Sequence, residues 1–108
     1  MPTFNDFLST FKEDLLGFAK DNLNEYKDEL IRDGNAFVEK TKSDLKRWTE
    51  GLALGTLSKK DFEFLIKGKK DLAQMEALKQ LGLSKIRINK ILDGVLEIVV
   101  GSALKTFL

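Results

Sequence analysis

The stretch from Ser84 to Leu108 constrains the fold more than any other part of the chain. On a helical wheel with about 3.6 residues per turn, its glycines and most of its charged residues fall on one narrow stripe: Arg87, Lys90, Gly94, Glu97, Gly101 and Lys105. The remaining arc is mostly hydrocarbon, and it is much wider than the apolar stripe of roughly 100° that an ordinary surface helix carries. We therefore predict a helix over 84–107 that is buried on several sides and covered by the rest of the chain.

Two other structures for this stretch, a membrane-spanning helix and a β-strand, are disfavoured. Charged residues interrupt it repeatedly, and no run approaches the roughly 18 uninterrupted apolar residues that a spanning helix needs. The segment from Val95 to Val100 is β-branched enough for a short strand, but the sequence holds no second run of this kind to pair with it.

Length and composition limit the class of protein. A chain of 108 residues predicts one domain, 1–108, with a modest core. The sequence contains neither cysteine nor histidine, which removes thiolate chemistry, the commonest general base near neutral pH and the commonest transition-metal ligand. We therefore expect a protein that is not an enzyme and that uses no cofactor or metal.

Charge is balanced overall but unevenly distributed. The formal net charge of +1 makes a dedicated nucleic-acid binder an unfavourable interpretation. Through Phe37 there are four basic and eight acidic side chains, net −4, and from Val38 onward fourteen basic and nine acidic, net +5. The two halves are expected to pack together, within one chain or between chains; an acidic-ligand surface on the basic half is the alternative. The start of the chain lacks the basic region of a secretory signal, which favours a cytoplasmic protein, with a position at the periphery of a membrane left open.

The N-terminal half carries an eleven-residue repeat. One series of positions is Phe4, Leu15, Tyr26, Phe37 and Trp48, and a second follows four residues later at Leu8, Ala19, Leu30, Thr41 and Leu52. Eleven residues in three turns give an apolar face that runs nearly parallel to the helix axis or winds around it in a right-handed supercoil. The repeat predicts a long amphipathic helix, or two collinear ones, over 3–54.

Asp33-Gly34-Asn35 is the expected place for a break in this half, because glycine ends many helices and asparagine can cap the next. A break predicts helices over about 3–33 and 36–54 and a compact four-helix monomer. A continuous helix would be about 77 Å long at about 1.5 Å per residue, which predicts a dimer or larger assembly instead. The repeat passes through Gly34 without a change of phase, so both interpretations stay open.

The C-terminal half predicts a helical hairpin over 59–107. Thr3 with Asp6 and Ser58 with Asp61 are weak capping patterns, and Gly82-Leu83-Ser84 combines a helix end with the cap of the last helix. The helix expected over 59–81 presents a nearly heptad stripe in which Gly68 would admit a neighbouring backbone: Phe62, Leu65, Gly68, Leu72 and Met75. The expected fold is thus all-α, an antiparallel three- or four-helix bundle with this hairpin packed against 3–54.

A bundle without catalytic groups favours a protein–protein interaction or oligomerisation module. The expected partner is a second copy or another helical protein. The expected contact residues are the hairpin stripe together with two aromatic residues of the covering helix: Phe62, Leu65, Gly68, Leu72, Met75, Phe37 and Trp48.

The alternative function is binding to an anionic membrane surface. Eleven-residue amphipathic repeats resemble those of synucleins, perilipins and exchangeable apolipoproteins, and Glu39-Lys40-Thr41-Lys42 is similar to one copy of the synuclein repeat, although Ser43 and Asp44 follow it here where that repeat has Gly-Val. The resemblance implies a lipid-binding role. The repeat face would then insert, and the residues expected at the headgroups are Lys40, Lys42, Lys46 and Arg47.

Overall fold

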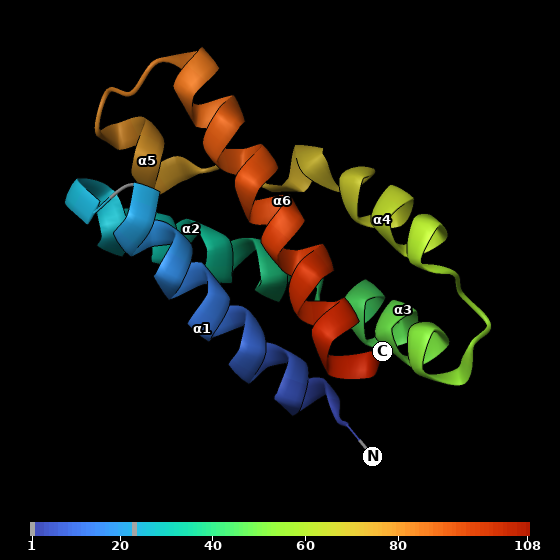
Figure 1. Ribbon diagram of the computed structural model, residues 1–108. Coiled ribbons are helices and arrows are strands. Elements are labelled where there is room, and N and C mark those ends of the chain that lie inside the picture. The colour runs from blue at the N-terminus through green and yellow to red at the C-terminus, as the bar shows by residue number, and fades with distance from the viewer. Residues whose placement is uncertain (1, 23) are drawn as a thin grey trace.

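The all-α class is confirmed by the computed structural model, which describes residues 2–22 and 24–108 and has no strand among them. Figure 1 shows the described elements in chain order: α1 (Phe4–Asn22), the short 3₁₀ turn η1 (Asn24–Tyr26), α2 (Lys27–Lys40), α3 (Lys42–Leu54), α4 (Lys59–Lys67), a second 3₁₀ turn η2 (Lys70–Leu72), α5 (Glu76–Gln80) and α6 (Lys85–Phe107).

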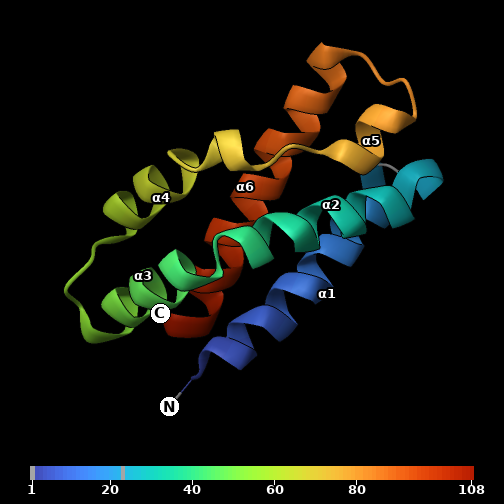
Figure 2. The same cartoon turned by 180° about the vertical axis from the view of Figure 1, so that it is seen from behind.

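Helix α6 is the centre of the bundle. It packs against α1, α3 and α4, and it passes between α1 and α4 in both views of the molecule (Figures 1 and 2). The helix predicted over 84–107 is therefore confirmed and the strand alternative is wrong. Its buried side chains are Ile88, Ile91, Leu92, Val95, Leu96, Val99, Val100, Ser102 and Ala103. Within the described residues, none of the helices combines the length and apolar character that crossing a bilayer requires.

The helix starts follow the local sequence closely. The Thr3 amide donates to Asp6 Oδ2 at 2.7 Å, and the Asp6 amide donates back to Thr3 Oγ1 at 3.2 Å, which forms a reciprocal capping box. Ser58 caps α4 by accepting from the Asp61 amide at 3.1 Å. Ser84 caps α6 in the same way, accepting from the Arg87 amide at 3.2 Å. The predicted caps are thus confirmed.

The predicted helix break at Gly34 is wrong. Helix α2 continues through Gly34, which is buried, and a Cβ there would lie 2.6 Å from Leu15 Cδ2 of α1. This glycine allows two helices to approach each other and does not end one. The chain turns instead at η1, and it bends at Thr41, whose hydroxyl donates to the Phe37 carbonyl at 2.8 Å, a bond that commonly bends helices.

The continuous-helix alternative is also wrong, because the longest dimension of the molecule is 42 Å. The ten repeat positions lie in three helices, the turn η1 and the bend at Thr41, and do not form one stripe. Six are buried and four are partly buried against the core. The apolar side chains of the repeat therefore face the interior of the chain.

The single helix predicted over 59–81 is divided. Helix α4 ends at Lys67, η2 follows, and Met75 adopts a left-handed conformation with φ of 53° immediately before α5. Gly68 is exposed at the end of α4, and a Cβ there would meet only the Phe64 and Leu65 carbonyls at 3.4–3.5 Å, so the prediction of close backbone approach at Gly68 is wrong. The chain turns here because α5 packs against α2.

Asp33 of α2 explains how α5 is held. The residue is 7% exposed, and its carboxylate accepts from two backbone amides of α5, Ala77 to Oδ1 at 3.0 Å and Leu78 to Oδ2 at 2.9 Å. Met75, the residue before α5, makes no side-chain cap hydrogen bond. Asp33 therefore supplies the N-terminal cap of α5 from a distant part of the sequence.

A second polar contact joins α1 to α6. Asp14 Oδ2 accepts from the hydroxyl of Ser102 at 2.8 Å, and Asp14 Oδ1 accepts from Lys105 Nζ at 3.0 Å. Ser102 is fully buried, whereas the Asp14 side chain is 25% exposed. Removing Asp14 and removing the Ser102 hydroxyl should therefore change the free energy of unfolding by different amounts.

We expect Asp14→Ala to lower the free energy of unfolding by about 1–2 kcal/mol, because the buried Ser102 hydroxyl loses its acceptor. Ser102→Ala should cost under about 0.5 kcal/mol, since water can reach Asp14 and Lys105 still pairs with it. Urea unfolding of the two variants measures the difference. Equal losses would mean that the hydrogen bond itself, and not the buried hydroxyl, determines the effect.

Candidate interaction surface

The contact residues predicted from the sequence do not share one exposed surface. Phe37, Phe62 and Met75 are at most 3% exposed and belong to the core of the chain itself. Trp48 and Leu65 are half-buried, while Gly68 and Leu72 are exposed. The division of the hairpin helix separates these side chains, so they are not one stripe available to a partner.

Three of the four cations expected at lipid headgroups lie beside different side chains. Lys40 Nζ donates to Gln74 Oε1 at 3.1 Å, and Lys42 is half-buried. Lys46 Nζ lies 5.6 Å from the centre of the Phe4 ring, and Arg47 Cζ lies 5.9 Å from the centre of the Trp48 ring. Lys46 and Arg47 therefore contact different aromatic side chains.

Trp48 lies in a cluster of charges that ties α3 to the segment after α4. Asp44 accepts from Arg47 at 2.6 Å and is paired with Lys69 Nζ at 3.0 Å, and Lys69 lies 5.8 Å from the centre of the Trp48 ring. The pKa of the Asp44 carboxyl lies below its usual range, chiefly because of the hydrogen bond from Lys69. The positive charge of Lys69 and the contact with Arg47 lower it further. The stabilisation from these pairs is present above the ordinary pKa of aspartate and is lost as the pH falls through the lowered value.

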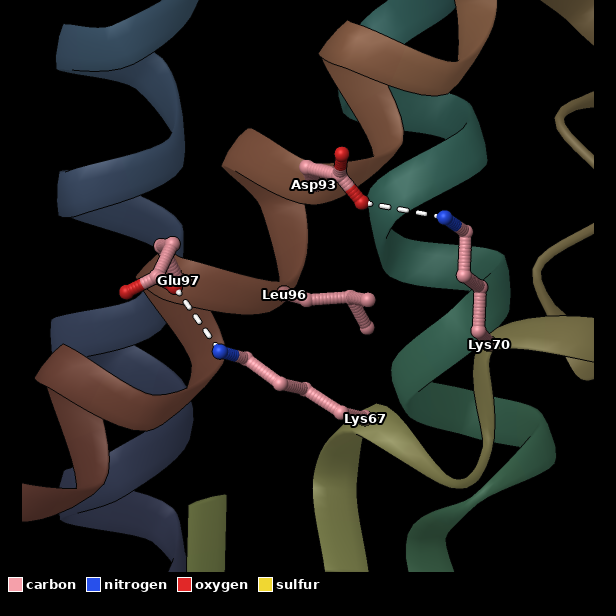
Figure 3. Close-up of a pocket in the computed structure, with 5 residues that line it drawn as sticks. All are labelled: Lys67, Lys70, Asp93, Leu96 and Glu97. Carbon is pink, nitrogen blue, oxygen red and sulfur yellow. Dashed lines mark hydrogen bonds and ion pairs between the residues drawn. The ribbon is translucent and has the colours of Figure 1, made fainter. Parts of the chain in front are cut away.

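A surface hollow of about 370 Å³ is lined by residues of α4, η2 and α6. Figure 3 shows its lining residues, Lys67, Lys70, Asp93, Leu96 and Glu97, with the two lysines reaching toward the two carboxylates. Lys67 Nζ lies 3.5 Å from Glu97 Oε1, and Lys70 Nζ lies 3.1 Å from Asp93 Oδ1. A hydrogen bond to Glu63, with the smaller effect of Glu97, raises the pKa of Lys67. Two exposed ion pairs therefore join the end of α4 and the turn η2 to α6 across this hollow.

An apolar hollow of about 380 Å³ lies at the end of the bundle where α1 begins and where α3 and α6 end. Both ribbon views place α3 and the last turn of α6 near the start of α1 (Figures 1 and 2). We call its lining residues the end patch: Pro2, Phe4, Lys46, Thr49, Glu50, Ala53, Leu54 and Phe107. Leu54 is 63% exposed, and Phe4 and Phe107, which line the same hollow, are partly buried.

The local sequence of α3 produces this arrangement. Lys46, Glu50 and Leu54 are spaced by four residues and are exposed on one face of the helix. Thr49 turns inward, where its hydroxyl donates to the Leu45 carbonyl at 2.7 Å. Gly55, with φ of 77°, then ends α3 directly after Leu54. The result is an apolar centre with one cation and one anion at its edge.

The end patch was missed by the sequence-based interpretation, apart from Lys46, which was assigned to lipid headgroups. One signal was available: Leu54 falls outside both series of the repeat and shares a helix face with Lys46 and Glu50. A single exposed apolar residue is common on protein surfaces, so Leu54 becomes informative only together with Phe4 and Phe107, which line the same hollow.

The arrangement of acidic side chains does not suggest a metal centre, since no group of three or more potential ligands is gathered in residues 2–22 and 24–108. Comparison of the chain with protein-family models, with curated proteins and with solved structures gives no match.

Proposed function

We propose that this chain is a non-catalytic helical module that self-associates through the end patch. The observation that carries the proposal is Leu54, which is 63% exposed and lines a hollow together with Phe4 and Phe107. An apolar centre surrounded by charged side chains is the usual anatomy of a protein–protein interface. Isolated exposed residues such as Phe64 and Ile86 carry less weight, because single apolar side chains are common on protein surfaces.

The membrane-surface alternative has less support. The side chains that would insert into a bilayer are buried or half-buried against the core, so insertion of the repeat face would require α1 and α3 to separate from α6, and α2 to separate from α1 and α5. Separation would expose the apolar side chains of α6 at the same time, which opposes it. Three of the four cations proposed for headgroup contact, Lys40, Lys46 and Arg47, have different neighbours.

The test is a comparison of two exposed apolar residues at distant places, Leu54 of the end patch and Ile86 at the start of α6. Sedimentation equilibrium from about 1 µM to about 1 mM should show reversible association of the unmodified chain, in the range of a small interface. Leu54→Gln should weaken association by about tenfold or more, because truncated interface centres typically cost over about 1 kcal/mol.

Ile86→Gln, at a residue that is 73% exposed, is the matched control and should leave association unchanged. A chain that stays monomeric across the whole range, or an equal effect of the two substitutions, would contradict the proposal. Circular dichroism on both variants establishes that helix content is retained. Anionic vesicles added to the same samples test the membrane alternative, which requires a rise in bound protein that Leu54→Gln does not abolish.

A further inference from the structure

The end patch carries a cation and an anion whose placement is suited to a second copy of the same surface. Lys46 and Glu50 are both exposed and lie four residues apart on α3, a rise of about 6 Å along the helix. Lys46 Nζ lies over the ring of Phe4, 5.6 Å from its centre, so its ammonium group is held at the edge of the hollow.

Resting on the proposed self-association, we infer that two copies meet end patch to end patch about a two-fold axis that passes between Lys46 and Glu50. A two-fold interface brings one surface against itself, so that residue i meets residue j and j meets i. With the two α3 helices antiparallel, Lys46 of each copy lies beside Glu50 of the other. One pair of residues thereby provides two intermolecular ion pairs.

The other arrangements of this surface are less favourable. If the two α3 helices ran parallel about the axis, Lys46 would face Lys46 and Glu50 would face Glu50, and such like-charge contacts suppress association. A head-to-tail contact would require a different complementary surface and would continue into rings or filaments. The two-fold arrangement closes at a dimer and brings the two apolar hollows together, which covers Leu54, Phe4 and Phe107.

The charges decide orientation and the apolar centre supplies most of the affinity. Ion pairs at the edge of an interface contribute little to affinity in salt, but a like-charge contact in their place strongly disfavours one orientation. The patch is small and belongs with weak interfaces, so the dimer should dissociate in the micromolar range or above. Association should also weaken as salt screens the two pairs.

Charge exchange between Lys46 and Glu50 tests this geometry directly. Lys46→Glu alone and Glu50→Lys alone each place like charges together twice, and each should weaken dimerisation by about tenfold or more. An equimolar mixture of the two single variants should form heterodimers, because every position then meets its opposite charge. The double variant Lys46→Glu/Glu50→Lys should dimerise within about threefold of the unmodified chain. Lys60→Glu, on the exposed face of α4, is the matched control and should change nothing.

Sedimentation equilibrium on the separate and mixed variants gives the result, and circular dichroism checks that each remains folded. If the mixture stays monomeric while Leu54→Gln still weakens association relative to the unmodified chain, the end patch associates in another geometry. The two-fold arrangement is then wrong, and the proposed self-association stands. If the unmodified chain associates but none of these substitutions affects it, or if it never associates, the proposed function fails together with the inference.

Discussion

Asp33→Ala is expected to lower the free energy of unfolding by about 3 kcal/mol. Two backbone amides of α5, those of Ala77 and Leu78, donate to the Asp33 carboxylate in a site that is 7% exposed. Hydrogen bonds to a charged group are worth about 1.5–3 kcal/mol each, and a buried donor without an acceptor costs about 1–3 kcal/mol. The better helix propensity of alanine returns only about 0.5 kcal/mol.

Urea unfolding followed by circular dichroism measures the loss. Asp33→Asn should give an intermediate value, because the amide oxygen can accept one bond while its NH₂ group faces the second donor. Glu39→Ala, at an exposed position of the same helix, is the matched control and should stay within about 0.5 kcal/mol of the unmodified chain. An Asp33→Ala value as small as that of Glu39→Ala would show that α5 does not depend on this cap.

Gly34→Ala should destabilise the fold although alanine is the better helix former. A Cβ at this position would lie 2.6 Å from Leu15 Cδ2, and Leu15 is 1% exposed, so the leucine can move only by displacing other side chains of the core. Overpacking of this kind costs about 1–3 kcal/mol, which outweighs the gain of about 1 kcal/mol from replacing glycine within a helix. A net loss of about 1–2 kcal/mol in thermal or urea unfolding is expected.

Three other helical glycines act as controls for this result. An added Cβ at Gly17 or Gly101 would meet no side chain or neighbouring helix within 4 Å, so alanine there should stabilise by about 0.5–1 kcal/mol. At Gly94 the Cβ would lie 2.6 Å from Phe18 Cζ, but Phe18 is only partly buried and can swing aside, so we expect an intermediate effect. Stabilisation by Gly34→Ala equal to that at Gly101 would contradict the close contact between α1 and α2.

The parts of the fold that follow from short-range sequence were predictable. The caps at Thr3, Ser58 and Ser84 involve residues three positions apart, and the buried helix from Lys85 to Phe107 follows from its own apolar width. Gly34 was misinterpreted because a glycine that ends a helix and a glycine that admits a neighbouring helix look the same in one sequence. The difference lies in Leu15, on another helix.

The same reasoning explains why the contact surface was not predicted. The end patch combines the start of α1, the second half of α3 and the last turn of α6, and no local pattern joins these three segments. The hairpin stripe was expected to be such a surface, but it depended on an unbroken helix from 59 to 81. That helix is broken at the turn that brings α5 to Asp33, a contact between residues 44 positions apart.

The cap on α5 also bears on the order in which the chain folds. A helix of five residues is far below the length of about 12–15 residues at which isolated helices become marginally stable in water, so α5 cannot persist before α2 is in place. The C-terminal half thus depends on a carboxylate of the N-terminal half to complete its own structure. A fragment that begins at Lys59 would keep the sequence of α5 and α6 but would lack the acceptor that protects the Ala77 and Leu78 amides from hydrogen exchange.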